Sequence, residues 1–208
     1  MSGYVTLKES LDASRTALII WDLQAGLAGQ ADNRAVLAEQ VPKLIAGARA
    51  AGCRVIWSRH VGAPVDELSP AAIRIAMRMQ GVSDPAAIAQ YMPEGSPDGE
   101  WVEWASPDSG DVVLSKSLPT FFVGTGLDSL LRGWSIDTLV LAGVATDHGI
   151  EVTTRHGLAL GFTCVVASDG TGSFTADTHQ DALGRLSQTA EVLSVPEILA
   201  IWESGTQN

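Results

Sequence analysis

The stretch VLAGVATDHGIEVTTRHG, residues 140–157, joins an apolar run to a helical pattern. The run ends at Gly143 and is rich in Val and Leu, as in a buried strand, whereas the residues beyond Gly149 repeat at helical spacing. The stretch therefore predicts a strand, a tight turn and a helix. In a sheet of parallel strands such a turn lies at the carboxyl edge, where ligands bind.

The same alternation of short β-branched runs and longer helical patterns extends over most of the chain and predicts βαβ units. We expect an α/β fold, a Rossmann-like three-layer α/β/α sandwich with a mostly parallel six-stranded sheet, in a single domain over residues 1–208. The predicted strands are ALIIWD (17–22), CRVIWSRH (53–60), DVVLSK (111–116), TLVLAG (138–143), TCVVASD (163–169) and EVLSV (191–195). The predicted helices cover residues 33–51, 70–79, 85–91, 125–132, 148–160 and 176–188, and the irregular segment 61–110 is expected to be an insertion or lid.

Composition excludes several classes of partner. The net charge is −11 and the 13 basic residues are dispersed, which argues against a nucleic-acid groove. No apolar stretch approaches the roughly 20 residues that span a bilayer, and the polar start MSGYVTLKES does not resemble a signal peptide. We therefore expect a cytoplasmic protein that binds neither nucleic acid nor membrane. Cys53 and Cys164 each open an apolar run and are expected to be buried free thiols.

Polar residues at the ends of the predicted strands are the candidates for function. Asp22 ends the first strand and Lys116 the third, so only the fold can bring this carboxylate and this ammonium together. Taken alone, each has an ordinary explanation, because a strand-end Asp is often a helix N-cap and a strand-end Lys is often solvated.

Three ordered motifs change this assessment. They are IIWDLQ (19–24), LSKSLPTFFVGTGL (114–127) and LVLAGVATDHGIEVTTRHGLALGF (139–162), and together they resemble the isochorismatase-like hydrolases. This superfamily includes isochorismatases, nicotinamidases and N-carbamoyl amide hydrolases. The resemblance implies that Asp22 is the catalytic acid/base, Lys116 its cationic partner and Gly149 the nucleophile position. It also implies a cis peptide between Val144 and Ala145, which aims backbone N–H groups at a substrate oxygen.

Gly149 is a departure from most amide-cleaving members, which carry Cys at this position to form an acyl-enzyme. The resemblance extends, however, to isochorismatase itself, which has Gly there and cleaves a vinyl ether. That reaction needs an acid of raised pKa, a cation that orients it, and space for water. We expect Asp22, Lys116 and an open volume above Gly149 to supply these three parts, and hence the hydrolysis of an enol ether or similar bond without a covalent Cys intermediate.

Other functions remain open. Asp22 can instead activate water against an amide or a ring carbonyl, and a Cys-to-Gly change introduced into an amidohydrolase would give the same sequence. A catalytically inactive homologue that binds a metabolite or protein is a third possibility, although the presence of both Asp22 and Lys116 favours an enzyme. A dianionic substrate would need cations, for which Arg59, Arg74 and Arg78 are the candidates. If none of them faces the site, a neutral ring or an amide becomes the better substrate.

The remaining expectations concern the surroundings of the site. No metal-ligand spacing occurs, so no metal and no cofactor is expected. His156 and His179 are predicted at the surface, while Trp101 and Trp104 are expected in a lid or a subunit interface of a homo-oligomer, a dimer or tetramer. The partner is a small-molecule substrate. The residues expected to bind it are Gln24, His60, Phe122, Val144, Ala145 and His148.

Overall fold

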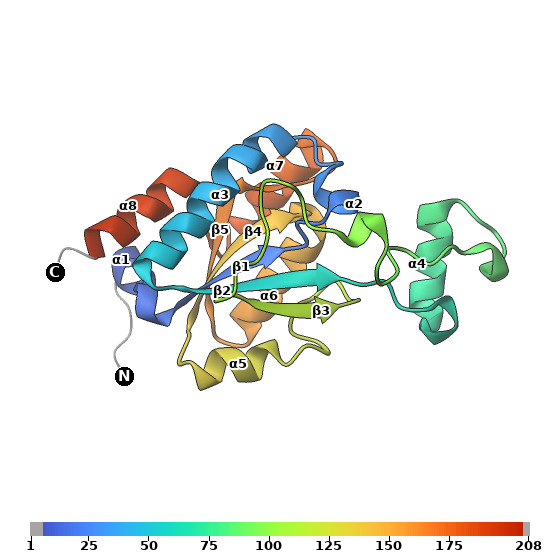
Figure 1. Cartoon of the computed structure of the whole chain (residues 1–208), viewed down its shortest axis with the longest axis horizontal. Helices are drawn as coiled ribbons and strands as arrows, with labels where there is room; N and C mark the ends of the chain where they lie inside the picture. The colour runs from blue at the N-terminus through green and yellow to red at the C-terminus, as the bar shows by residue number, and fades with distance from the viewer. Residues whose placement is uncertain (1–5, 206–208) are drawn as a thin grey trace.

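The computed structural model of the chain describes residues 6–205 (Figure 1). Six strands form one sheet in the order β3-β2-β1-β4-β5-β6, and every neighbouring pair is parallel. The predicted α/β sandwich is therefore confirmed, and its sheet is parallel throughout. The strands are β1 (Thr16–Trp21), β2 (Arg54–His60), β3 (Val112–Lys116), β4 (Thr138–Val144), β5 (Thr163–Gly172) and β6 (Glu191–Leu193).

Strand β1 lies near the centre of this sheet, between β2 and β4. All its residues are buried, since helices cover both faces of a parallel sheet and leave no strand face for solvent. The chain runs from β1 to β2 and β3 on one side and returns to β4 on the other. The strand order thus reverses between β1 and β4, and the carboxyl ends of these two strands border the crevice where such sheets bind ligands.

Helices form the two outer layers (Figure 1). One face of the sheet packs against α3 and α8, with Leu37, Leu44 and Ile198 in the first core cluster. The other face packs against α5, α6 and α7, with Leu131 and Leu186 in the second cluster. The helices are α1 (Leu7–Ser10), α2 (Ala25–Ala28), α3 (Arg34–Ala51), α4 (Pro70–Gln80), α5 (Leu127–Gly133), α6 (Glu151–Ala159), α7 (Ala176–Leu186) and α8 (Val195–Gly205).

The sequence predicts helices α3 to α7 within a few residues, but it misses the short helices α1 and α2 and differs from the structure at two further places. The helix expected over 85–91 is only a 3-10 turn, Pro85–Ala87, because the backbone becomes extended at Ile88. Helix α8 was not predicted, and the expected strand over 191–195 ends at Leu193. The Val195 amide donates a hydrogen bond to Asp169 Oδ1 (2.6 Å), a contact between distant segments that helps to begin this helix.

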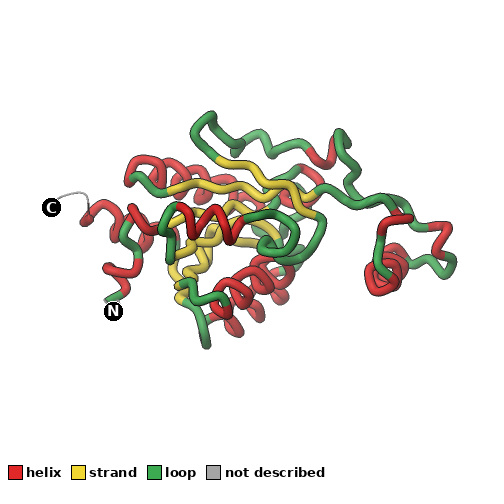
Figure 2. The backbone as a smooth tube through the Cα atoms, turned by 90° about the horizontal axis from the view of Figure 1, so that it is seen from below, coloured by secondary structure: helices red, strands yellow, loops and turns green. Residues whose placement is uncertain are grey.

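Residues 61–100 form an arm that carries α4 beyond the carboxyl edge of the sheet (Figures 1 and 2). Ser69 caps the amino end of α4, and Gly81 ends it in a left-handed conformation. No residue of α4 is buried, so this helix packs little against the body of the protein. Within residues 6–205, no helix combines the length and apolarity that crossing a membrane requires.

Candidate active site

The carboxyl ends of β1 and β3 bring an acid and a base together. Lys116 ends β3, and its Nζ donates a hydrogen bond of 2.6 Å to Asp22 Oδ2. Both side chains are buried, with exposed fractions of 2% for Lys116 and 5% for Asp22. The predicted contact between the two charged groups is therefore present.

Ser58 is a third member of this cluster and was not predicted. Its Oγ donates to Asp22 Oδ1 (2.5 Å) and accepts from the Asp22 backbone N–H (3.0 Å). Ser58 pairs in register with Trp21, the residue before Asp22, so the hydroxyl lies beside the carboxylate. A lone hydroxyl residue in a buried apolar strand is the signal that sequence reasoning overlooked. Asp22 itself has φ +46°, in the left-handed region that few non-glycine residues adopt.

Burial controls the electrostatics of the pair. It raises the pKa of Asp22, against the opposing effects of the Lys116 charge and of hydrogen bonds from Lys116 and Ser58. It also lowers the pKa of Lys116, although the Asp22 carboxylate acts in the opposite direction. The two shifts bring the pKa values of Asp22 and Lys116 closer together. The raised pKa makes Asp22 a better proton donor than an ordinary aspartic acid.

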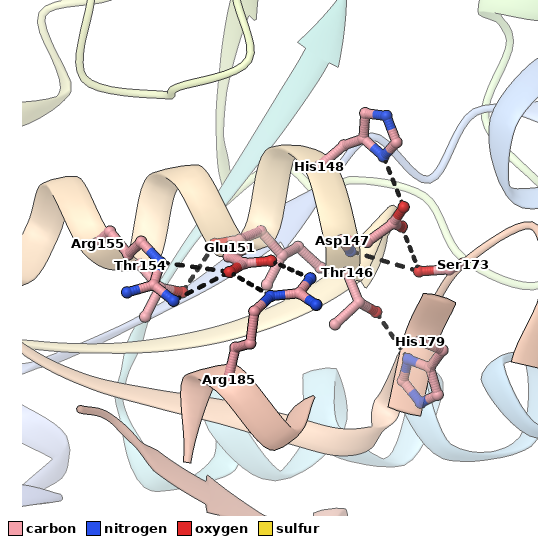
Figure 3. Close-up of polar contacts among 10 residues, drawn as sticks. Thr146, Asp147, His148, Glu151, Thr154, Arg155, Ser173, His179 and Arg185 are labelled. Atoms are coloured by element: carbon pink, nitrogen blue, oxygen red, sulfur yellow. Dashed lines mark hydrogen bonds and ion pairs between the residues drawn. The ribbon is translucent and has the colours of Figure 1, made fainter. Parts of the chain in front are cut away.

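The turn after β4 forms the second wall of the site. The peptide between Val144 and Ala145 is cis, as predicted, and a π-helical turn over Thr146–Ile150 leads into α6. Distant residues hold this turn (Figure 3): a hydrogen bond joins Thr146 Oγ1 to His179 Nδ1 (2.9 Å). Ser173 Oγ donates a second bond, of 2.6 Å, to Asp147 Oδ1.

Gly149 lies in this turn against the indole of Trp21. A Cβ atom on residue 149 would lie 2.2 Å from Cε2, Cζ2 and Nε1 of Trp21. The expectation of an open volume above Gly149 is therefore wrong: the Trp21 side chain fills the place where a nucleophilic side chain would begin. No sequence pattern indicates this contact, because residues 21 and 149 meet only in the folded chain.

The comparisons with known proteins agree with this geometry, since residues 16–197 match the isochorismatase domain. The chain belongs to the isochorismatase family. The isochorismatase family protein YecD of Escherichia coli O157:H7 is 33% identical over 202 residues, which cover 91% of this chain and 97% of YecD. The ureidoacrylate amidohydrolase RutB of Pantoea ananatis is 32% identical over 173 residues, which cover 76% of this chain and 69% of RutB.

A crystal structure of a cysteine hydrolase from Pseudomonas syringae pv. phaseolicola 1448A superposes with a TM-score of 0.82 at 25% identity. The match covers 99% of this chain and 100% of that one. Members of the isochorismatase family and its amidohydrolase relatives are hydrolases, and this chain is an isochorismatase-family hydrolase.

Neither cysteine of this isochorismatase-family chain lies in a setting that activates a thiol. Both are buried and free. Burial raises the pKa of Cys53 to about 12, with a smaller effect from Asp12, and burial alone raises the pKa of Cys164 to about 12. Cys164 is the second residue of β5 and lies at the amino edge of the sheet, opposite the Asp22–Lys116 pair.

Of the residues expected to bind substrate, Gln24 and His60 lie next to the pair but have different surroundings. The Gln24 side chain is fully buried and clamps the backbone, donating to the carbonyls of His60 and Gly99 (both 3.0 Å) and accepting from the His60 N–H (2.7 Å). The His60 ring is half-buried, 5.5 Å from the Tyr91 ring. Burial and then the Asp22 carboxylate raise the pKa of Tyr91, which places this phenol near the pair.

His148 and Phe122 point elsewhere. The His148 side chain is 66% exposed and its Nδ1 lies 2.9 Å from Asp147 Oδ2, on the side of the turn opposite His179 (Figure 3). Phe122 stacks on Phe162, 5.7 Å between centroids, and Phe162 precedes β5 at the amino edge of the sheet. Within residues 6–205, neither side chain makes a hydrogen bond or ring contact with Asp22 or Lys116.

The two histidines expected at the surface are not free there. His179 is buried, because α7 turns it onto Thr146 of the π-helical turn. His156 is half-buried, with its Nδ1 hydrogen-bonded to Thr120 Oγ1 at 2.9 Å. A helical pattern alone does not say which face of a helix packs on a neighbouring element, and both predictions were wrong for this reason.

The arginine candidates do not reach the pair. The Arg59 guanidinium lies over the Trp101 ring, 5.7 Å from its centroid. Arg74 and Arg78 are exposed on α4, in the projecting arm. Trp101 packs edge-on against Trp57 and, like Trp104, is only half-buried against the first core cluster. The Asp22–Lys116 pair therefore has no arginine partner among residues 6–205.

The pKa of His60 tests how far water is excluded from this part of the site. Burial, with a smaller effect from the Lys116 charge, lowers the pKa of His60 to about 4. We expect the His60 ring to titrate near pH 4 in heteronuclear NMR spectra, with the signal assigned by its loss in His60→Gln. Because a neutral ring is favoured in the folded state, its stabilising effect is complete above about pH 6.5 and is lost as the pH falls toward 4.

The same linkage gives a second readout for His60. Between pH 7 and pH 4, the wild type should lose more free energy of unfolding than His60→Gln, which lacks the ring. A His60 pKa near 6.5 would contradict the burial of this ring.

Proposed function

We propose that this isochorismatase-family hydrolase cleaves a small metabolite by proton transfer through Asp22, without a covalent enzyme intermediate. The observation that carries the proposal is the buried Asp22–Lys116 contact of 2.6 Å beside a glycine at the nucleophile position. A covalent route needs an activated nucleophile, and the two thiols of this chain are buried with raised pKa values.

The bond that suits this arrangement is an acid-labile C–O bond such as an enol ether. Protonated Asp22 transfers its proton to the enol-ether carbon and gives an oxocarbenium ion. Water adds to that ion and returns a proton to the Asp22 carboxylate, and the resulting hemiketal breaks into a carbonyl compound and an alcohol. The Lys116 ammonium stabilises the carboxylate formed in the first step, and Ser58 orients it.

The substrate is expected to carry little negative charge. Lys116 is already paired with Asp22, and the three candidate arginines lie against Trp101 or on the exposed α4. An anionic substrate would therefore enter a site whose cation is compensated, which is unfavourable in a buried setting. We infer a neutral ring or chain compound rather than a dianion.

A second reaction is supported by similarity to the ureidoacrylate amidohydrolase RutB. Here ionised Asp22 activates a water molecule against an amide or ureido carbonyl, and backbone N–H groups of the turn at Ala145 stabilise the oxyanion. This version also avoids an acyl-enzyme. It differs from the first in the protonation state that Asp22 needs.

We also infer a homo-oligomer, a dimer or tetramer, in the cytoplasm. The support for an oligomer is the apolar surface left uncovered on the projecting arm, where Ile75 is 55% and Met79 75% exposed.

A substrate panel with thiol alkylation tests the proposed function. Neutral enol ethers, simple amides and ureido compounds are assayed with untreated and iodoacetamide-treated protein, and hydroxylamine is added to trap any acyl-enzyme. Turnover of a panel member is expected to survive alkylation and to yield no hydroxamate, since Cys53 and Cys164 are buried.

The panel also separates the two reactions, because an acid role for Asp22 predicts kcat/KM that falls as the pH rises, and a base role predicts the reverse. Turnover that disappears when Cys164 alone is alkylated would overturn the non-covalent mechanism.

A further inference from the structure

Trp21 joins the site as the last residue of β1, one position before Asp22. Its side chain is almost fully buried, and the ring of Phe121 meets it edge-on at 5.6 Å between centroids and 86° between planes. On another side the indole contacts Lys116, whose Nζ lies 4.2 Å from the ring centroid. The indole is thus packed between Phe121, Lys116 and the Gly149 turn.

The ring face gives Lys116 a second electrostatic partner. Within the described residues, the hydrogen bond that Nζ donates goes to Asp22 Oδ2, and the ammonium also lies over the indole. An aromatic face attracts a cation through its quadrupole, most strongly where water is absent, as around this buried pair. The contact therefore favours the charged form of Lys116 and fixes where the ammonium lies.

The large Trp21 side chain fits only because residue 149 has no side chain. A Cβ at residue 149 would come within 2.2 Å of three indole atoms, far inside van der Waals contact. The ring has little room to retreat, because Phe121 packs against it in the second core cluster. Any side chain at 149 would move the indole and so change its contact with Lys116.

We propose that Trp21 is a positioning residue, which holds the Lys116 ammonium against Asp22 by a cation–π contact and makes glycine the only residue that fits at position 149. This inference rests on the proposed function, in which the Lys116 ammonium stabilises the Asp22 carboxylate. It explains the glycine without reference to a nucleophile: the space is occupied by the residue that positions the cation.

The titration of Lys116 tests the inference without a substrate. The chain has three lysines, Lys8, Lys43 and Lys116, so the ¹³Cε signals of labelled lysine are readily assigned with Lys116→Met. The titratable groups around Lys116 are Asp22, directly after β1, and His60 from β2, with Tyr91 of the arm acting on Asp22, and none of them is altered in the test variants. A merely structural role for Trp21 would leave this titration unchanged in a folded variant.

Loss of the aromatic face is expected to lower the Lys116 pKa, since the ring favours the charged form. We expect a decrease of about one pH unit in Trp21→Leu and of about half a unit in Trp21→Phe, which keeps a smaller ring. Circular dichroism and thermal melting establish that each variant is folded. If Trp21→Leu does not fold, Trp21→Phe and the glycine variants below carry the test.

The glycine variants provide an independent arm. Gly149→Ala is expected to lower the Lys116 pKa as Trp21→Leu does, because the methyl group displaces the indole. Gly184→Ala in α7 is the matched control, since a Cβ there has no neighbour within 4 Å, and it should leave the titration unchanged. Gly149→Ala should change the Lys116 pKa less in the Trp21→Phe background than in the wild type, because the smaller phenyl ring has no counterpart of the indole Cζ2 and leaves the methyl group more room.

An unchanged Lys116 pKa in folded Trp21→Leu, or in folded Gly149→Ala, would overturn the inference. Failure of the proposed function would appear instead as Asp22-independent turnover in the substrate panel, which this titration does not measure.

Discussion

Asp22→Asn is expected to lower kcat/KM for the best substrate of the panel by about a hundredfold to ten-thousandfold. Asparagine keeps the shape of the side chain: its amide oxygen can still accept the hydrogen bond from Lys116, and its NH2 group can donate to the Ser58 hydroxyl. It can neither donate nor take up the catalytic proton. Because asparagine does not titrate, the pH dependence that comes from the raised pKa of Asp22 should vanish in whatever activity remains.

The matched control for this prediction is Asp128→Asn on α5. The Asp128 side chain is 45% exposed and pairs with Arg132 one helical turn away, so its loss should change kcat/KM little. Asp22→Asn protein that is folded and retains wild-type kcat/KM would exclude Asp22 as the proton-transfer group.

Lys116→Met is expected to affect both catalysis and stability. Removal of one partner of a buried ion pair typically costs about 3–5 kcal/mol when the other charge is left behind. Asp22 can relieve part of this cost by taking up a proton, because the variant lacks both the charge and the hydrogen bond by which Lys116 lowers the pKa of Asp22. Its carboxyl group would then lose the orientation that catalysis needs, and kcat/KM should fall with it.

The loss of stability in Lys116→Met should depend on pH in a definite direction. In this variant the pKa of folded Asp22 rises further above its unfolded value of about 3.8. The stabilisation from a protonated Asp22 is complete below that unfolded value and is lost as the pH rises through the folded one. The deficit relative to wild type, measured by urea unfolding, should therefore be larger at pH 8 than at pH 5.

Lys43→Met is the control for this series, since Lys43 makes an exposed pair with Glu39 on α3 and its side chain is 52% exposed. Its free energy of unfolding should change by less than about 0.5 kcal/mol at either pH. A deficit of Lys116→Met that is constant from pH 5 to pH 8 would show that Asp22 does not respond to the lost charge.

The parallel sheet and the candidates for its acid–base pair could be predicted before the fold was known. The six apolar runs are separated by helical patterns, and right-handed βαβ connections leave few other ways to assemble them than a parallel sheet. In such a sheet the carboxyl ends of all strands lie at one edge, so Asp22 and Lys116 were candidates at the same edge, and the family resemblance implied that they act as a pair. The cis peptide between Val144 and Ala145 was implied by family resemblance.

Other parts of the site depend on contacts between elements that no local pattern encodes. Ser58 lies beside Asp22 because of the register between β1 and β2, and His179 is buried because α7 packs on the turn after β4. The arginine candidates lie apart from the pair because their segments fold against Trp101 or project with α4. Side-chain direction across such contacts follows from packing, which a one-dimensional pattern does not contain.

The residue that fills the space at Gly149 could be identified only from the folded chain. From the sequence, a glycine at this turn indicates an absent side chain and hence room for water. In the fold, the indole of Trp21 occupies that room, 128 residues earlier in the chain, and Lys116 lies over its face. The physical reason is close packing: a protein interior leaves few voids, so the volume that one residue gives up is taken by another, and which residue takes it is fixed only when the elements assemble.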